Sequence, residues 1–271
     1  MRKSVFFNSI YLIFSLFVSI ACSESFEKIR NSGDPDLILS KADAYYEDEN
    51  WANAQILYEQ LLGSFRGKNK AERIFYNFAD TYFQQGQYIL SSYHFKRFAV
   101  TYPNSILRPD ADFMVAYSEY KQSPKFRLDQ EPTERAMEAF QEFINRYPTS
   151  DRVAECNQLM DELRVKLEKK SFEASKLYYD MREYQSAAHT FKNFVRDFPD
   201  SDRIDYARYL ACKSEYLLAA NSIPEKQFER YEQVIKDFEA FQEKHGDSRY
   251  IEELKEYSNI SKEKINQLSN G

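Results

Sequence analysis

Four segments of the chain repeat one pattern, in which two phenylalanines are followed by a proline or glycine and then by a serine. The copies read "FKRFAVTYPNS" from Phe95, "FQEFINRYPTS" from Phe140, "FKNFVRDFPDS" from Phe191 and "FEAFQEKHGDS" from Phe238. Phenylalanines at i and i+3 lie on one face of a helix, and the Pro or Gly beyond them ends that helix. Because one helix pair cannot cover its own apolar face, the repeat predicts pairs that stack on one another.

Two copies of the pattern extend upstream over a full helix pair. Ahead of Pro103 and of Pro199, alanine, tyrosine and phenylalanine fall at the intervals of the tetratricopeptide repeat, which these segments resemble. A weaker copy near the start of the body carries Ala42, Tyr45 and Trp51 at matching intervals. The chain has only 6 glycines, which favours helices over strands and hairpins. The predicted fold is all-α, a right-handed superhelix of five tetratricopeptide-like helix pairs.

Prolines mark the breaks in this array. Asp34-Pro35 is typical of a helix start, and Pro124 and Pro132 bracket a polar inserted loop. The stretch from Asp151 to Asp180 lacks Pro and Gly, which predicts one long helix. The predicted parts are a signal peptide at 1–21, a lipidated tether at 22–34, N-terminal repeats 1–3 with a substrate groove at 35–150, and C-terminal repeats 4–5 with a partner scaffold at 151–268.

The first residues have the composition of a secretory signal. Arg2 and Lys3 precede an apolar run from Val5 to Ala21, which is shorter than the roughly 20 residues of a spanning helix. A small residue before Cys22 is typical of a lipoprotein box, in which the cysteine is lipidated and becomes the new N-terminus. Plain secretion after a small-x-small site, or a cysteine placed there by chance, are the alternatives.

Charge and residue spacing exclude several function classes. Removing residues 1–21 leaves 37 − 2 = 35 basic and 43 acidic residues, a net charge of −8, which argues against nucleic acid. The three histidines lie far apart without metal-ligand spacing, so no metal site is expected. The sequence contains no nucleophile elbow and no phosphate-binding glycine loop. We therefore expect no enzyme activity, and no cofactor other than a covalent lipid on Cys22.

Two further cysteines, Cys156 and Cys212, fall in predicted first helices of their pairs. In an oxidising compartment they could form a disulfide, but free cysteines are also commonly buried as small core residues. Both alternatives are open at this point.

The arrangement as a whole resembles the BamD family of outer-membrane assembly lipoproteins, part of the β-barrel assembly machinery. The resemblance rests on the lipoprotein box, on "ERAMEAFQEFINRYPTSDRVAEC" after the Pro-bracketed loop, and on "VKLEKKSFEASKLYYDMREYQSAAHTFKNFVRDFPDS". It implies a lipid-anchored protein on the periplasmic face of the outer membrane, docked on a POTRA-bearing barrel subunit. It also implies that N-terminal units receive unfolded outer-membrane proteins and that C-terminal units hold partner subunits. The alternative is another periplasmic repeat lipoprotein that organises cell-wall or division enzymes.

The family's pattern assigns ligand contacts to fixed positions of each first helix. The implied substrate-peptide groove consists of Leu39, Asp43, Tyr46, Arg73, Tyr76, Asp80 and Phe83, and the implied partner-binding residues are Lys176, Tyr179 and Asp180. An aromatic groove with a few polar groups suits an extended peptide. Core or inter-unit packing is the alternative for the same aromatics. Tyr82 and the repeated phenylalanines are expected in the core.

Overall fold

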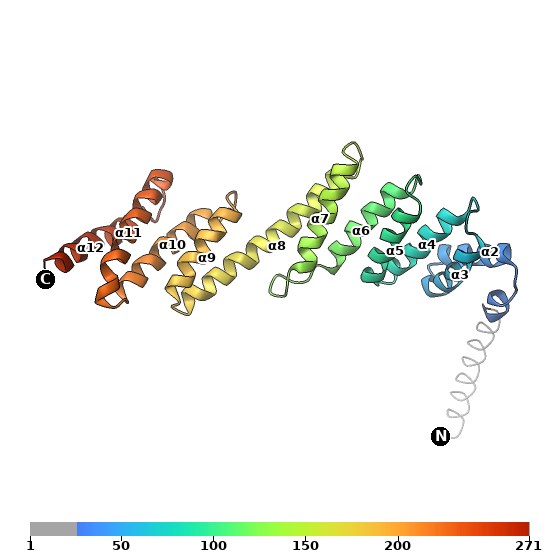
Figure 1. Ribbon diagram of the computed structural model, residues 1–271, viewed down its shortest axis with the longest axis horizontal. Helices are drawn as coiled ribbons and strands as arrows, with labels where there is room; N and C mark the ends of the chain where they lie inside the picture. The colour runs from blue at the N-terminus through green and yellow to red at the C-terminus, as the bar shows by residue number, and fades with distance from the viewer. Residues whose placement is uncertain (1–25, 271) are drawn as a thin grey trace, which may run out of the picture. The chain divides into compact units, whose positions relative to one another are not determined.

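The computed structural model describes residues 26–270, which contain helices and turns and no strand (Figure 1). The helices are α2 Pro35–Glu47, α3 Trp51–Ser64, α4 Ala71–Gln84, α5 Tyr88–Thr101, α6 Arg108–Gln122, α7 Glu131–Arg146, α8 Val153–Asp180, α9 Tyr184–Asp197, α10 Ile204–Ala220, α11 Pro224–His245 and α12 Ile251–Ser269. Residues 26–30 are also helical. Consecutive helices pack as pairs, which confirms the all-α array, and α12 packs on the last pair, α10 and α11.

The chain forms two compact units. Unit 1 contains the described residues up to Pro124 together with Asp129–Met160, and unit 2 contains Lys125–Leu128 and the described residues from Asp161 onward. The division therefore falls inside the long helix α8 rather than at the expected position after residue 150. Helix α8 itself confirms the single helix expected from the absence of Pro and Gly.

The repeated phenylalanines form the cores of both units. Phe95, Phe98, Phe140, Phe143, Phe191 and Phe194 are at most 2 % exposed. In unit 1 they pack with small residues of the first helices, of which Ala42 and Ala79 are fully buried. In unit 2, Phe172 of α8 contacts Phe191 and Phe194 edge-on, with ring centroids 5.9 and 5.5 Å apart. Their assignment to the core is confirmed.

The serine of the motif forms hydrogen bonds that stabilise the turn after the second helix. In all four copies its hydroxyl accepts the backbone N–H two residues further on, at 3.0 to 3.3 Å. In three copies the hydroxyl also donates to a carboxylate on the first helix of its own pair: Ser105 to Glu72 at 2.5 Å, Ser201 to Glu168 at 2.7 Å and Ser248 to Asp205 at 2.9 Å. The motif thus buries its phenylalanines and ends the second helix, and in three of its four copies it also ties the turn to the first helix.

The start of the body differs from the expected tether. Asp34 caps α2 through its carboxylate, which accepts the N–H groups of the first turn, as Asp34-Pro35 predicted. Ahead of it, residues 26–30 form a short helix instead of a free polar spacer. Phe26 packs edge-on against Tyr45 at 5.9 Å, and Ile29 packs against the core of unit 1. The expectation for 22–34 is corrected over this part, because two apolar side chains three residues apart hold the segment on the body.

Candidate functional site

The predicted groove residues lie on first helices of unit 1, and their polar members bind one another. The guanidinium of Arg73 on α4 donates two hydrogen bonds to Asp43 on α2, at 2.7 and 2.9 Å. The Tyr58 hydroxyl donates to the same carboxylate at 2.8 Å and accepts from Asn77 at 3.2 Å. The hydrogen bond to Asp43 raises the pKa of Arg73. A bidentate pair of this kind fixes both side chains and joins the first two helix pairs.

A second contact joins α2 and α4 further along the same face. The Tyr46 hydroxyl donates to Asp80 at 2.5 Å, and the Gln84 amide donates to both Asp80 oxygens at 3.3 and 3.2 Å. Asp80 is buried, and its burial raises the pKa of the carboxyl, although the two hydrogen-bond donors oppose the shift. The Tyr46 ring also meets Trp51 edge-on at 5.1 Å. The Tyr46 ring is therefore held in one orientation.

The apolar members of the predicted groove divide into buried and half-buried residues. Leu39 is 3 % exposed and belongs to the core, so its assignment to the groove is wrong. Tyr76 is half-buried and meets Phe95 edge-on at 5.2 Å. Phe83 is half-buried and stacks on Tyr117 of α6 at 5.5 Å. Of the predicted groove residues, Phe83 and Tyr76 are therefore the partly exposed apolar ones besides Tyr46, and Leu39 is not.

One aromatic residue recurs at the same place in the first helix of every pair, four residues after a small buried residue. The aromatics are Tyr46, Phe83, Tyr120, Tyr179 and Tyr216, following Ala42, Ala79, Ala116, Ser175 and Cys212. All five aromatics are half-buried, between the fully buried core rings and the solvent-exposed residues. We call this set the aromatic row. Sequence reasoning found three of its members and missed Tyr120 and Tyr216, although the same spacing from a small residue marks them.

In unit 1 the aromatic row continues from α4 to α6 through stacked rings. Tyr117 stacks on Phe113 at 5.7 Å and on Tyr120 at 5.8 Å, and the two planes of the latter pair differ by only 6°. The Lys121 ammonium lies 4.9 Å from the Tyr117 ring centroid. Stacked, partly exposed rings with a cation beside them can bind apolar or aromatic side chains and a nearby negative charge.

In unit 2 the predicted partner-binding residues lie at the end of α8. The Lys176 ammonium donates to Asp180 at 2.6 Å, and this hydrogen bond raises the pKa of Lys176. Tyr179 meets Tyr184 edge-on at 6.1 Å and packs against the core of unit 2. Lys176 and Asp180 are 40 % and 52 % exposed at their side chains, so the pair remains accessible to a partner.

Beyond these residues, unit 2 contains a network that the sequence did not reveal. Lys213 of α10 donates to Glu253 of α12 at 2.8 Å, and the hydroxyls of Tyr209 and Tyr257 donate to the same carboxylate at 2.9 and 2.5 Å. Burial raises the pKa of Glu253, but the hydrogen bonds outweigh it and the net pKa is lowered. Tyr257 also stacks on Tyr216 of the aromatic row at 4.2 Å. The row is thus fixed in this unit as well.

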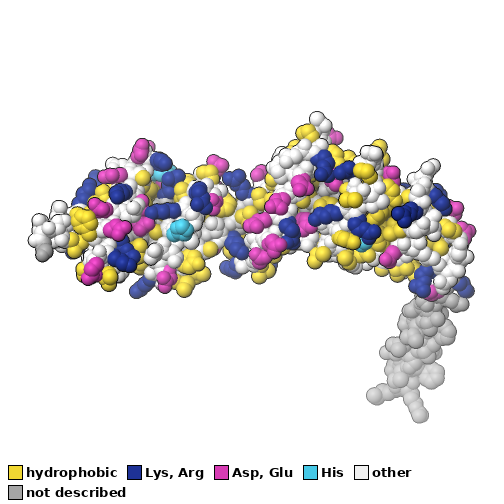
Figure 2. All heavy atoms as spheres, in the orientation of Figure 1, with side chains coloured by type: hydrophobic (Ala, Val, Ile, Leu, Met, Phe, Trp, Pro, Cys, Tyr) yellow, Lys and Arg dark blue, Asp and Glu magenta, His cyan; other side chains and the backbone are white. Residues whose placement is uncertain are grey.

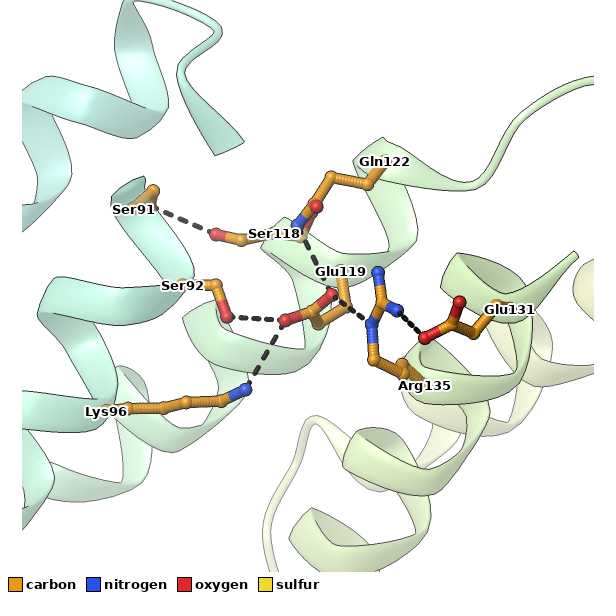
Figure 3. Close-up of polar contacts among 8 residues, drawn as sticks. All are labelled: Ser91, Ser92, Lys96, Ser118, Glu119, Gln122, Glu131 and Arg135. Atoms are coloured by element: carbon orange, nitrogen blue, oxygen red, sulfur yellow. Dashed lines mark hydrogen bonds and ion pairs between the residues drawn. The ribbon is translucent and has the colours of Figure 1, made fainter. Parts of the chain in front are cut away.

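Glu119 of unit 1 is a buried carboxylate surrounded by hydrogen-bond donors (Figure 3). One oxygen accepts from Ser92 at 2.7 Å and from Lys96 at 3.4 Å, and the other accepts from Gln122 at 3.3 Å and Arg135 at 3.4 Å. The network joins α5, α6 and α7, and both oxygens are turned toward these donors. Its geometry is that of a bridge between helices rather than of an acid or base facing a substrate.

The thiols of Cys156 and Cys212 are also buried. Cys156 and Cys212 are free and buried, as the core alternative expected, and burial raises the pKa of their thiols to about 11 and about 12. Among residues 26–270, no group of histidine, cysteine and acidic side chains could hold a metal ion. No helix within the same range is long and apolar enough to cross a membrane. On the face shown in Figure 2, basic and acidic side chains are interspersed over each unit rather than gathered by sign.

Comparison with known protein families points to an outer membrane lipoprotein. The model of a family described as "YfiO: Outer membrane lipoprotein" matches residues 32–178 and 165–268. Among solved structures, the TPR domain of P58(IPK) aligns at a TM-score of 0.39 and 11 % identity, over 92 % of this chain and 68 % of that one, which is too low to bear on function. A search of curated proteins found no match.

Proposed function

Because the chain belongs to the YfiO family of outer membrane lipoproteins, we propose that it is a non-enzymatic scaffold of outer-membrane β-barrel assembly. A lipid on Cys22 would hold it on the periplasmic face of the outer membrane. This cysteine lies outside the residues that the structure describes. The first-helix face of unit 1 would bind unfolded barrel proteins, and that of unit 2 would bind a POTRA-bearing barrel subunit.

The aromatic row is the observation that carries this proposal. Its rings are half-buried, so each packs against the protein on one side and still presents the other side to a ligand. Core rings such as Phe95 present none, because they are fully buried. Partly exposed aromatic side chains in well-packed surroundings are the residues that dominate binding energy in protein interfaces.

The polar contacts of unit 1 favour an extended peptide as ligand. Asp80 holds the Tyr46 hydroxyl, and Asp43 holds Arg73, so ring and guanidinium are fixed before a ligand arrives. Such pre-organisation reduces the entropy that binding costs. An extended strand presents alternate side chains to one side, and successive rings of Tyr46, Phe83 and Tyr120 on α2, α4 and α6 offer contacts to them. Strands of unfolded barrel proteins have this alternating apolar pattern.

In unit 2 the proposal assigns partner docking to the exposed Lys176–Asp180 pair beside Tyr179. Charged residues at the margin of an interface govern encounter and orientation, and an aromatic beside them supplies contact area. Four side chains of α10 and α12 share hydrogen bonds around Glu253, and Tyr257 of this group packs against the same core cluster as Tyr179.

Affinity purification from detergent-solubilised membranes tests the proposed function. We expect recovery of a large β-barrel protein with periplasmic POTRA domains. Lys176→Glu should reduce its recovery while leaving helicity unchanged, whereas Lys226→Glu, an equal charge change at an exposed position of α11, should not. Recovery of cell-wall hydrolases without a barrel protein would instead favour a scaffold for cell-wall enzymes and end the proposal.

A further inference from the structure

Unit 2 has a small cavity between α9 and α11, which residues of α10 also line. Its volume is about 160 Å³, and Val195, Ala211 and Phe241 belong to its apolar lining. A cavity of about 150 Å³ holds a benzene-sized group, so this one has room for one apolar side chain. Ala240 and Lys244 of the lining are exposed, so the cavity is accessible from solvent.

Two basic side chains of the lining have no acidic partner. Arg208 of α10 is half-buried, and its Nε atom is buried without a hydrogen-bond partner. Among residues 26–270, neither Arg208 nor Lys244 forms an ion pair. The acid of the lining, Asp237, lies 2.8 Å from the ammonium of Lys192 instead. A buried donor without an acceptor is costly, so an acceptor supplied from outside the chain would stabilise this site.

The acid nearest to Arg208 along α10 is bound elsewhere. Asp205 lies one helical turn before Arg208 and accepts a hydrogen bond from the Ser248 hydroxyl at 2.9 Å. Its other oxygen is 3.8 Å from Nδ1 of His245. Asp205 therefore holds the turn before α12 and does not neutralise Arg208.

A groove at the equivalent place in unit 1 carries an acid where unit 2 has Arg208. Asp112 and Arg208 both lie 17 positions after the first phenylalanine of the preceding motif, and Arg146 and Lys244 both lie 6 positions after that of the next one. In unit 1, Arg146 donates to Asp112 at 2.8 Å. In unit 2 the same two places hold two cations, so this ion pair cannot form.

The neighbouring ion pair is present in both units. Lys96 lies 3.4 Å from Glu119, and the equivalent Lys192 lies 2.6 Å from Glu215. The two places are therefore built alike, and unit 2 lacks the carboxylate that neutralises the outer cation in unit 1.

The residues around this place are also smaller in unit 2. Ala211 and Ala240 stand where unit 1 has Val115 and Glu142. Smaller side chains leave space, and in unit 2 this space lies beside the unpaired guanidinium and ammonium groups.

We propose that this cavity binds an acidic side chain of a partner protein together with an apolar side chain next to it. The carboxylate accepts from Arg208 and lies beside Lys244, as that of Asp112 lies beside Arg146 in unit 1. The apolar side chain enters the space between Val195 and its neighbours. This docking site lies on α9, α10 and α11, apart from the Lys176–Asp180 pair of α8, and goes beyond the proposed function because it does not depend on a barrel subunit.

Methyl NMR of the purified, full mature chain tests the docking site. The probe is acetyl-Ser-Leu-Asp-Ser-amide, and the control peptide has asparagine in place of aspartate. Val195 and Ala211 report on the cavity, and Val100 and Val115 report on the equivalent groove of unit 1. We expect the aspartate peptide to shift the unit 2 methyl signals alone and to bind at least about tenfold more tightly than the asparagine peptide, because hydrogen bonds to charged groups are the stronger ones.

Two substitutions remove the proposed contact in different ways. Arg208→Asp gives unit 2 the acid that unit 1 has, so its own carboxylate should pair with Lys244 and weaken the aspartate peptide at least about tenfold. Lys244→Gln, at an exposed position, should keep the fold and weaken the same peptide several-fold. Arg146→Gln in the equivalent groove of unit 1 is the matched control and should leave the affinity unchanged. Circular dichroism checks that each variant is folded.

The proposal is overturned if the two peptides shift the Val195 and Ala211 signals equally, or if the aspartate peptide shifts neither at concentrations up to about 10 mM. Equal binding at the groove of unit 1 would remove the argument from the missing acid. Unchanged affinity in the folded variants of Arg208 and Lys244 would also contradict it. Because the experiment contains no barrel protein, a failure of the proposed function cannot produce any of these results.

Discussion

Two adjacent aromatics of α4 should separate stability from binding. Tyr82 is 8 % exposed, stacks on His94 at 4.7 Å and meets Phe78 edge-on at 5.3 Å. Phe83 is half-buried, stacks on Tyr117 and meets Tyr88 edge-on. Tyr82→Ala removes a core side chain, whereas Phe83→Ala removes a ring that belongs to the aromatic row.

The magnitudes differ because the two side chains are buried to different extents. Truncating a buried aromatic costs about 3 kcal/mol or more, so Tyr82→Ala should lower the melting temperature by roughly 6 to 12 °C. Phe83→Ala loses mainly its stacking contacts, about 1 kcal/mol, and should lower the melting temperature by roughly 2 to 4 °C. Peptide binding should change in the opposite order, with Phe83→Ala weakening it by roughly 5- to 30-fold.

The assay combines thermal unfolding, followed by circular dichroism, with fluorescence anisotropy of a labelled C-terminal strand peptide of a barrel protein. Binding is measured well below the melting temperature of each variant, so that both are folded. Tyr82→Ala should then retain its affinity for the peptide. If Phe83→Ala destabilises as much as Tyr82→Ala while the peptide binds as before, Phe83 is a core residue and the reasoning about the aromatic row is refuted.

Three further predictions concern the turns, the acid response and the anchor. Ser201→Ala should lower the free energy of unfolding, measured in urea, by about 1 to 3 kcal/mol, because it leaves Glu168 without its hydrogen-bond donor. Ser150→Ala should lower it less, because the Ser150 hydroxyl accepts only a backbone N–H at 3.3 Å. Equal losses in the two variants would contradict this. Because the pKa of Glu253 is lowered in the folded state, the charged carboxylate stabilises the fold above pH 4.5, and this stabilisation is lost as the pH falls below that value. The urea midpoints of wild type and Glu253→Gln should therefore differ at pH 7 and converge in acid. Cys22→Ala should abolish lipid attachment, and a variant that still fractionates with outer membranes would contradict the anchor.

The core of the fold was predictable because its signal is local. Two phenylalanines at i and i+3 before a helix-ending residue specify a buried face wherever they occur. The serine of the same motif could not be interpreted in this way. Its carboxylate partner lies on another helix, as Glu168 does for Ser201, and only the folded chain brings the two together.

The site was predictable in part, and its errors have physical causes. The repeat pattern predicts Leu39 in the groove, but the rotation of α2 turns this residue into the core. Tyr120 and Tyr216 carry the spacing from a small residue that marks Tyr46 and Phe83, and could have been found by extending that rule. The network around Glu253 could not, because Lys213 and Glu253 are far apart in sequence and on different helices.

The helix at 26–30, within the predicted tether at 22–34, has only a short signal in the sequence. Phe26 and Ile29 are three residues apart, the same spacing as in the repeated motif, within a segment that is otherwise polar. Two apolar residues were too few to indicate a helix from sequence alone. Packing against Tyr45 and the core supplies the stability that the segment lacks by itself.

Peptide binding to the first-helix face of unit 1 is tested most directly by locating a bound peptide on this unit. A C-terminal strand peptide of a barrel protein, with a photo-reactive group in place of its terminal aromatic, is cross-linked to the purified chain and the adducts are located by mass spectrometry. We expect adducts on the first helices α4 and α6, near Phe83 and Tyr120, and their loss in Phe83→Ala. Adducts confined to the second helices α5 and α7, or unchanged by this substitution, would contradict it.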